Sequence, residues 1–92
     1  MLRVQKTNTI LDKAKSLIYG DRATEYGSAS KNLERIAAGW SLIVDTEISA
    51  HDACLMMDWL KTCRLVHQNF HEDSIVDKAG YSGLLEKLMR GE

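Results

Sequence analysis

The sequence predicts an all-α fold, a compact bundle of about four helices that forms one domain over residues 1–92. The length of 92 residues leaves room for only one hydrophobic core. The chain has no proline and only six glycines, a composition that favours long helices over a turn-rich β fold. Apolar residues recur at three- and four-residue steps in four separate stretches. We expect residues 1–8 to form a loosely ordered N-terminal arm.

The first expected helix runs from about Thr9 to Tyr19. Thr9 and Asp12 form a capping-box-like pair at its start, and Gly20 suits the left-handed position that ends a helix. Residues 20–27 follow with mixed charge, a glycine at each end and no clear period. We expect an ordered loop there, which either carries function or serves as a solvated connector.

Three further helices are expected, from the spacing of their apolar residues, at about residues 30–44, 49–67 and 73–89. A second capping-box-like pair, Ser49 and Asp52, marks the start of the middle one. Gly80 lies inside the last helix, where it costs about 1 kcal/mol relative to alanine. It marks either a close approach of the backbone to another helix or a ligand, or a tolerated weakness.

The charge balance and the hydropathy argue against several classes of partner, although a local basic patch remains compatible with them. Twelve basic and thirteen acidic residues give a formal net charge of -1, so duplex nucleic acid is not an expected partner. No run approaches 18 consecutive apolar residues, so no transmembrane helix and no membrane partner are expected. The first residues also lack the apolar run of a signal peptide. We therefore expect a cytoplasmic protein.

The two cysteines, Cys54 and Cys63, lie nine residues apart in one expected helix. Their separation along the helix axis is roughly 13 Å, which is too far for a disulfide. We expect reduced thiols in the core, which fit a reducing compartment.

A row of polar residues follows the third expected helix at three-residue steps: Asp58, Lys61, Arg64 and His67. Neighbours in such a row share a helix face, so Lys61 and Arg64 offer a compact cationic pair. A guanidinium beside an ammonium suits a phosphate or a carboxylate. The alternative is a solvated face with an ion pair between Asp58 and Lys61.

The last expected helix opens with polar residues that also suggest a site. Asp73, Asp77 and Tyr81 are four residues apart and share a face, with His71 and Ser74 nearby. Two carboxylates beside a histidine could bind a divalent metal, or balance Lys61 and Arg64 across the hairpin. Acidic residues in a first turn also favour the helix dipole regardless of function.

The helical outline invites comparison with MazG-type all-α nucleoside triphosphate pyrophosphohydrolases, which hold magnesium with an E-x-x-E and a later E-x-x-D motif. The chain contains neither motif, since no two of its glutamates are three residues apart. Asp73-x-x-x-Asp77 is the nearest approach. This departure argues against hydrolysis by the usual metal scheme, and a relative that binds without cleaving remains open.

The chain carries short motifs along its whole length: Ile18-Tyr19-Gly20-Asp21-Arg22, Tyr26-Gly27, Asn32, Arg35-Ile36, Trp40, Leu55-Met56-Met57, Leu60-Lys61, Arg64-Leu65, His71-x-Asp73-Ser74 and Asp77-x-Ala79-Gly80-Tyr81. Over about residues 10–88 they resemble a small helical domain common in phages and prophages, a family without an assigned activity. A looser similarity is to phage domains associated with nucleotide modification, which share a Tyr-Gly loop and a closing D-x-A-x-Y helix. The resemblance supplies a phage setting rather than a mechanism.

The resemblance implies a polar site built from the motif residues. Cation, aromatic ring and acid together are what a nucleotide pocket needs, although each aromatic residue could instead belong to the core or its rim. No catalytic residue is expected. The expected ligand-binding residues are Tyr19, Asp21, Arg22, Tyr26, Asn32, Arg35, Trp40, Lys61, Arg64, His71, Asp73, Ser74, Asp77 and Tyr81.

The function that fits best is a phage-encoded sponge, which sequesters a phosphate-bearing nucleotide immune signal in the host cytoplasm. Its ligand would be a cyclic nucleotide or a signal like cyclic ADP-ribose, and no cofactor is expected. One alternative is a MazG-like hydrolase that uses Asp73 and Asp77 with a divalent metal. Another is a protein-binding inhibitor with an exposed apolar patch around Met56 and Met57. A homo-oligomer is expected, because so small a core gains stability from a partner copy.

Overall fold

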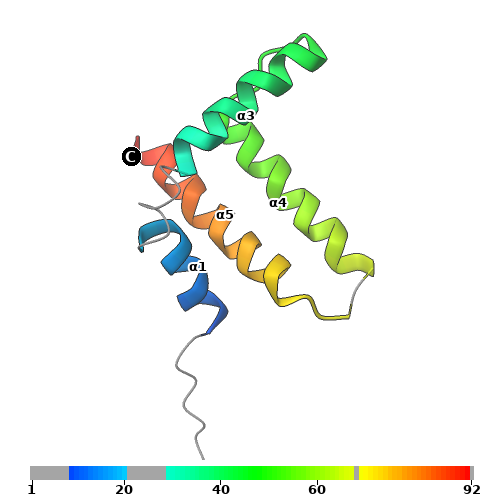
Figure 1. Ribbon diagram of the computed structural model, residues 1–92. Coiled ribbons are helices and arrows are strands. Elements are labelled where there is room, and N and C mark those ends of the chain that lie inside the picture. Colours follow the sequence, from blue (N-terminus) through cyan, green and yellow to red (C-terminus); the bar gives the residue numbers. More distant parts are fainter. Residues whose placement is uncertain (1–8, 21–28, 68, 92) are drawn as a thin grey trace, which may run out of the picture.

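Four α-helices make up the regular structure in the part of the chain that the computed structural model describes, which is residues 9–20, 29–67 and 69–91 (Figure 1). No strand occurs within these ranges, so the predicted all-α class is confirmed. The expected N-terminal arm, residues 1–8, and most of the expected loop lie outside them. The helices are α1 (Ile10–Tyr19), α3 (Ala29–Val44), α4 (Ala50–His67) and α5 (Glu72–Arg90).

The longest helix, α5, organises the arrangement. It packs along α1 on one side and along α4 on the other, and α3 packs mainly on α4 (Figure 1). The turn between α3 and α4 lies at the end of a hairpin that projects away from α1 and α5. Asp45 adopts a left-handed conformation in this turn, with φ of 55°. The Ser41 hydroxyl oxygen accepts from the Ile48 backbone N–H at 2.8 Å and so ties the two sides together.

The core lies where all four helices meet. It contains one buried residue from α1, two each from α3 and α4, and one from α5: Ile18, Leu33, Ala37, Ala53, Cys54 and Leu84. The two α4 residues are small and almost fully buried, at 0% and 1% exposure, which lets that helix approach its neighbours closely. The apolar residues at the end of the α3–α4 hairpin are not part of this core, and Leu42 and Ile43 there are about four-fifths exposed.

Both predicted capping boxes are present. The Asp12 backbone N–H donates to the Thr9 hydroxyl and the Thr9 backbone N–H donates to the Asp12 carboxylate, each at 3.1 Å. Ser49 and Asp52 make the same reciprocal pair at 3.0 and 3.3 Å. These hydrogen bonds satisfy backbone donors that the first helical turn leaves free, so the starts of α1 and α4 are encoded locally.

The predicted left-handed conformation of Gly20 is wrong. Its φ and ψ are -94° and -162°, and its backbone N–H donates to the Ser16 carbonyl at 2.9 Å. A Cβ atom at this position would lie 2.6 Å from that carbonyl oxygen. Glycine is therefore required by a close approach rather than by a positive φ. The left-handed cap belongs instead to Gly91, with φ of 77°, at the end of α5.

The prediction that both cysteines lie in the core is correct for Cys54 and wrong for Cys63. Both are free thiols, but Cys63 is exposed because it lies on the side of α4 opposite Cys54. Burial raises the pKa of the Cys54 thiol, and the Asp58 carboxylate adds to that effect. The Cys54 Sγ donates to the Tyr81 carbonyl at 3.2 Å, which links α4 to α5.

Candidate functional site

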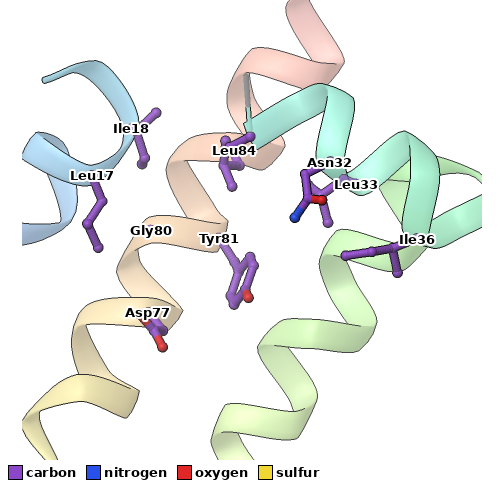
Figure 2. A pocket seen from close by; sticks show the side chains of 10 residues that line it. Leu17, Ile18, Asn32, Leu33, Ile36, Asp77, Gly80, Tyr81 and Leu84 are labelled. Carbon is purple, nitrogen blue, oxygen red and sulfur yellow. The ribbon is translucent and has the colours of Figure 1, made fainter. Parts of the chain in front are cut away.

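A cavity of about 200 Å³ lies between α1, α3 and α5, and we call it the inner cavity (Figure 2). Three polar side chains line it: Asn32 from α3, and Asp77 and Tyr81 from α5. All three belong to the predicted ligand-binding set. The other walls are mainly apolar, and their larger side chains are Leu17, Ile18, Leu33, Ile36 and Leu84. Ligand sites for drug-sized molecules measure about 300–1,000 Å³, so this cavity fits one ring system rather than a whole nucleotide.

The Asp77 carboxylate at the cavity wall is held by a lysine from α4. The Lys61 Nζ lies 2.9 Å from the Asp77 Oδ2, and the Lys61 side chain is only 13% exposed. The expected balance of charge across the hairpin is therefore present for this pair. The alternative ion pair between Asp58 and Lys61 does not form, because Asp58 pairs with Lys78 at 2.9 Å instead.

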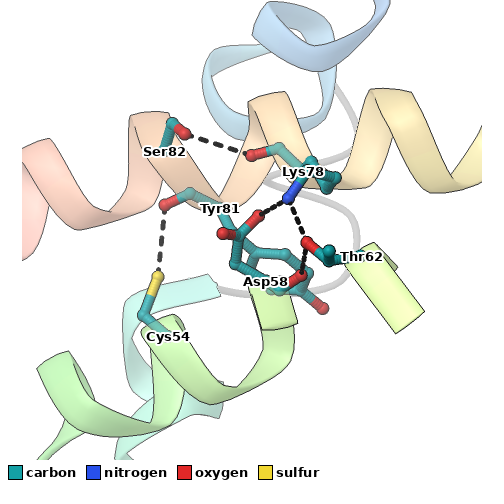
Figure 3. Close-up of polar contacts among 6 residues, drawn as sticks. All are labelled: Cys54, Asp58, Thr62, Lys78, Tyr81 and Ser82. Carbon is teal, nitrogen blue, oxygen red and sulfur yellow. Dashed lines mark hydrogen bonds and ion pairs between the residues drawn. The ribbon is translucent and has the colours of Figure 1, made fainter. Parts of the chain in front are cut away.

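A second set of polar contacts joins α4 and α5 beside the cavity (Figure 3). Lys78 donates to the Asp58 carboxylate and to the Thr62 hydroxyl. Together with the hydrogen bond from the Cys54 thiol to the Tyr81 carbonyl, these contacts fix about two turns of α4 against about one turn of α5. Burial raises the pKa of Tyr81, and Asp77 and Cys54 add to that effect. The phenol therefore stays protonated at neutral pH and can donate a hydrogen bond.

Gly80 is a buried residue of α5 that lines the inner cavity. A Cβ atom there would meet no heavy atom within 4 Å, so helix packing does not explain the glycine. At Gly83, one turn later in α5, a Cβ would lie 2.6 Å from the Ile18 Cδ1. The open space beside Gly80 is therefore part of the inner cavity. At Gly83 the space is filled by Ile18, where α1 packs on α5.

Gly80→Ala is expected to raise the free energy of unfolding by about 0.5–1 kcal/mol, because alanine is the better helix former and its methyl group meets open space. Gly83→Ala is expected to lower it, because the buried Ile18 would have to move. Urea unfolding followed by circular dichroism measures both. Equal changes in the two variants would contradict the packing of α1 on α5.

Three other predicted site residues lie at the start of α5, where His71 is the N-cap residue. Its Nδ1 lies 2.7 Å from the Ser74 hydroxyl and accepts from the Ser74 backbone N–H at 3.3 Å. Ser74 is fully buried. Asp73 is exposed and lines a separate hollow of about 310 Å³ between α1 and α5, beside the Lys13–Glu72 ion pair. Asp73 and Asp77 thus line different hollows.

The predicted cationic pair is not assembled around either hollow. Lys61 is held by Asp77 inside the helix packing, whereas Arg64 is exposed and lines neither the inner cavity nor the hollow at Asp73. Arg35 is also exposed and follows Asn32 by one turn of α3. Residues three apart share a helix face, so Arg35 lies on roughly the same side of α3 as Asn32. It also directly precedes Ile36, another residue that lines the cavity.

Two predicted aromatic residues lie outside the inner cavity. Tyr19 is 54% exposed, and the Lys87 Nζ lies 4.9 Å from its ring centroid, a cation–π contact between α1 and α5. Trp40 lines a different hollow, described below. The predicted residues Asp21, Arg22 and Tyr26 lie outside the described part of the chain.

An apolar groove of about 580 Å³ lies between α3 and α4, and the predicted apolar patch covers only part of it. The expected patch at Met56 and Met57 is half correct, because Met56 lies in the groove and Met57 packs on the core. Trp59, at 67% exposure, lies outside the predicted patch. The sequence does contain a signal for the groove, because α4 also carries large apolar residues on the side away from Asp58 and Lys61. The groove residues are Trp40, Leu55, Met56, Trp59, Leu60 and Cys63.

Across residues 9–20, 29–67 and 69–91, no group of three or more His, Cys, Asp or Glu side chains is placed to hold a metal ion. The hydrolase alternative therefore has no gathered donor set in this part of the chain. None of the helices described has both the length and the hydropathy that a membrane span requires.

Comparison with known proteins places the chain among phage sequences. A family model described as "Domain of unknown function (DUF6378)" matches residues 9–89. The Gene 55 protein of Mycobacterium phage L5 is 41% identical over 85 residues, which cover 91% of this chain and 54% of that protein. The Gene 55 protein of Mycobacterium phage D29 is 35% identical over 82 residues, covering 89% and 54%. The chain thus spans about half the length of these curated relatives. No solved structure matches it.

Proposed function

Because the chain belongs to the phage family described as a domain of unknown function, DUF6378, we propose that it serves a phage by sequestering a phosphate-bearing nucleotide signal and so counters host defence. The predicted resemblance to a small helical phage domain is confirmed. The observation that carries the proposal is the inner cavity, which combines apolar walls with three polar groups of different chemistry.

The inner cavity suits a nucleobase. Its volume of about 200 Å³ and its leucine and isoleucine walls fit a flat ring. The Asp77 carboxylate accepts hydrogen bonds from the amino groups of a base, and the Asn32 amide both donates and accepts. The Tyr81 phenol stays protonated and supplies a donor. The ion pair with Lys61 restrains the Asp77 carboxylate, so this acceptor is held in place before a ligand arrives.

The phosphates would lie outside the cavity, because Lys61 is already paired and the cavity is too small to hold them. Arg35 is exposed one turn along α3 from Asn32 and can offer its guanidinium to a phosphate in the solvent. A ligand with its base inside and its charged groups outside fits this distribution of polarity. Sequestration requires only such binding and needs no nucleophile.

Calorimetric titration tests the proposal with a panel of cyclic dinucleotides, cyclic ADP-ribose isomers and common nucleotides. At least one phosphate-bearing nucleotide is expected to bind, and Asp77→Asn is expected to weaken it at least about tenfold, because a charged hydrogen-bond acceptor contributes about 1.5–3 kcal/mol. Asp73→Asn is the matched control, since this exposed carboxylate lies on the same helix and outside the cavity.

The nucleotide is expected to be recovered intact when the complex is denatured. Recovery of a cleaved product would favour the hydrolase alternative. If no member of the panel binds, the proposal is wrong. The groove between α3 and α4 would then favour the second candidate, a protein-binding inhibitor, because it exposes apolar side chains that a protein partner could cover.

A further inference from the structure

The side of α4 that faces away from α5 carries a continuous row of apolar side chains. We call it the outer stripe, and it consists of Leu55, Met56, Trp59, Leu60, Cys63 and Val66. Trp59 and Val66 are 67% and 75% exposed. The opposite side of the helix carries Cys54 and Lys61, which contact α5. A contiguous row of large apolar side chains left this exposed is typical of an interaction surface, so the outer stripe is expected to be covered in solution.

The size of this surface also points to an interface. Soluble monomers rarely expose apolar patches larger than a few hundred Å², and these six side chains present an area on the order of 500 Å². Trp40 adds to it from the far wall of the groove. A stable protein interface buries about 800 Å² per partner, so the outer stripe and its surroundings are of the right order. In Figure 1, α4 lies at the edge of the molecule with α5 on one side only.

The spacing of the outer stripe identifies the kind of partner. Met56, Trp59, Cys63 and Val66 follow one another at steps of three, four and three residues. This alternation is the seam by which two helices pack against each other in a coiled coil. The partner therefore presents a helix with a matching apolar seam, and α4 itself is such a helix.

The charges at the two ends of the outer stripe favour an antiparallel copy. Asp52 lies at its N-terminal end, whereas Arg64 and His67 lie in the last turn of α4. An antiparallel neighbour brings the Asp52 of each chain to the basic end of the other, and it also opposes the two helix dipoles favourably. A parallel neighbour would bring like charges together.

We propose that a second copy of this chain packs against the outer stripe of α4, antiparallel, to form a two-fold symmetric dimer. In such a contact the residues near the centre of the patch lie close to their own copies in the partner, and Trp59 lies near the centre of the outer stripe. The Trp59 side chain of each copy then fills the groove of the other, and Met56 of one lies opposite Cys63 of the other. No residue of the outer stripe lines the inner cavity, so the dimer does not depend on the proposed ligand.

Light scattering after size exclusion tests the dimer. At about 50 µM, above the dissociation constants expected of an interface of this size, the protein is expected to elute at twice the 10.4-kDa mass of one chain. Trp59→Glu is expected to halve that mass and to keep the helical circular dichroism. Leu11→Glu is the matched control, because Leu11 is 72% exposed on α1 and outside the stripe, and this variant is expected to stay dimeric.

Disulfide trapping tests the antiparallel register. Under mild oxidation Met56→Cys is expected to give a covalent dimer through the native Cys63 of the other copy. The wild type, and Met56→Cys combined with Cys63→Ser, are expected to stay uncrosslinked. Crosslinking of either would indicate parallel helices and would overturn the register.

A wild type that stays monomeric would overturn the dimer, and so would dimerisation of Trp59→Glu. A host protein that binds a monomeric wild type but not Trp59→Glu would assign the outer stripe to a foreign partner.

Discussion

Asp77→Ala is expected to lower the free energy of unfolding by about 2–3 kcal/mol, because it leaves the Lys61 ammonium without its carboxylate inside the helix packing. Lys61→Met is expected to cost less, about 1 kcal/mol, because its methylenes stay packed and the Asp77 carboxylate can turn toward water. The exposed fractions of the two side chains, 13% for Lys61 and 33% for Asp77, are the reason for this asymmetry.

The double variant, with Lys61→Met and Asp77→Ala, closes the thermodynamic cycle. It is expected to be more stable than Asp77→Ala alone, because removing both charges removes the unpaired one. Urea denaturation of the four proteins measures the coupling. Additive losses in the double variant would mean that the two side chains do not interact in solution. The wall of the inner cavity would then lack the fixed carboxylate on which the proposed function rests.

Gly80→Leu is expected to abolish nucleotide binding, a loss of at least about a hundredfold, because a leucine side chain at this position occupies much of a cavity of about 200 Å³. The fold is expected to survive, since a Cβ at Gly80 meets no protein atom within 4 Å and leucine favours a helix. Calorimetric titration measures the binding loss, and circular dichroism checks the fold.

Gly39→Leu is the matched control for this substitution. Gly39 also lies inside a helix, and a Cβ there also meets nothing within 4 Å, but the residue does not line the inner cavity. Binding is expected to be unchanged in this variant. If Gly80→Leu binds as the wild type does, the ligand occupies another part of the protein. If both variants lose binding, the effect comes from the helices rather than from the cavity.

The helices and their starts could be predicted because their signals are local. Thr9 with Asp12, and Ser49 with Asp52, are three residues apart, and each pair makes its hydrogen bonds within one turn. The periodic spacing of apolar residues likewise reports the backbone conformation of the segment that carries it. Gly20 shows the limit even here, because glycine is compatible both with a left-handed cap and with a close approach to a carbonyl.

The candidate site could be predicted only in part, because its residues come from several helices. Asp77 and Tyr81 share a face of α5 by their spacing, and that much is visible in the sequence. Asn32 joins them only because α3 crosses near α5. Asp73 shares the spacing and lines another hollow, because α1 packs against that end of the helix. The spacing of residues in a sequence predicts which of them share a face of one helix. It does not predict which other helix packs against that face.

By itself, the sequence determined the all-α class, the approximate extents of the four helices described and the two capping boxes, because these follow from interactions within three or four residues. The tertiary structure decided which side of α4 faces the core. Met57 and Met56 are neighbours on a helix with apolar residues on more than one side, and only the position of α5 turned the first inward and left the second exposed. It also chose Asp77 rather than Asp58 as the partner of Lys61, because the register of α5 against α4 sets which carboxylate lies within reach.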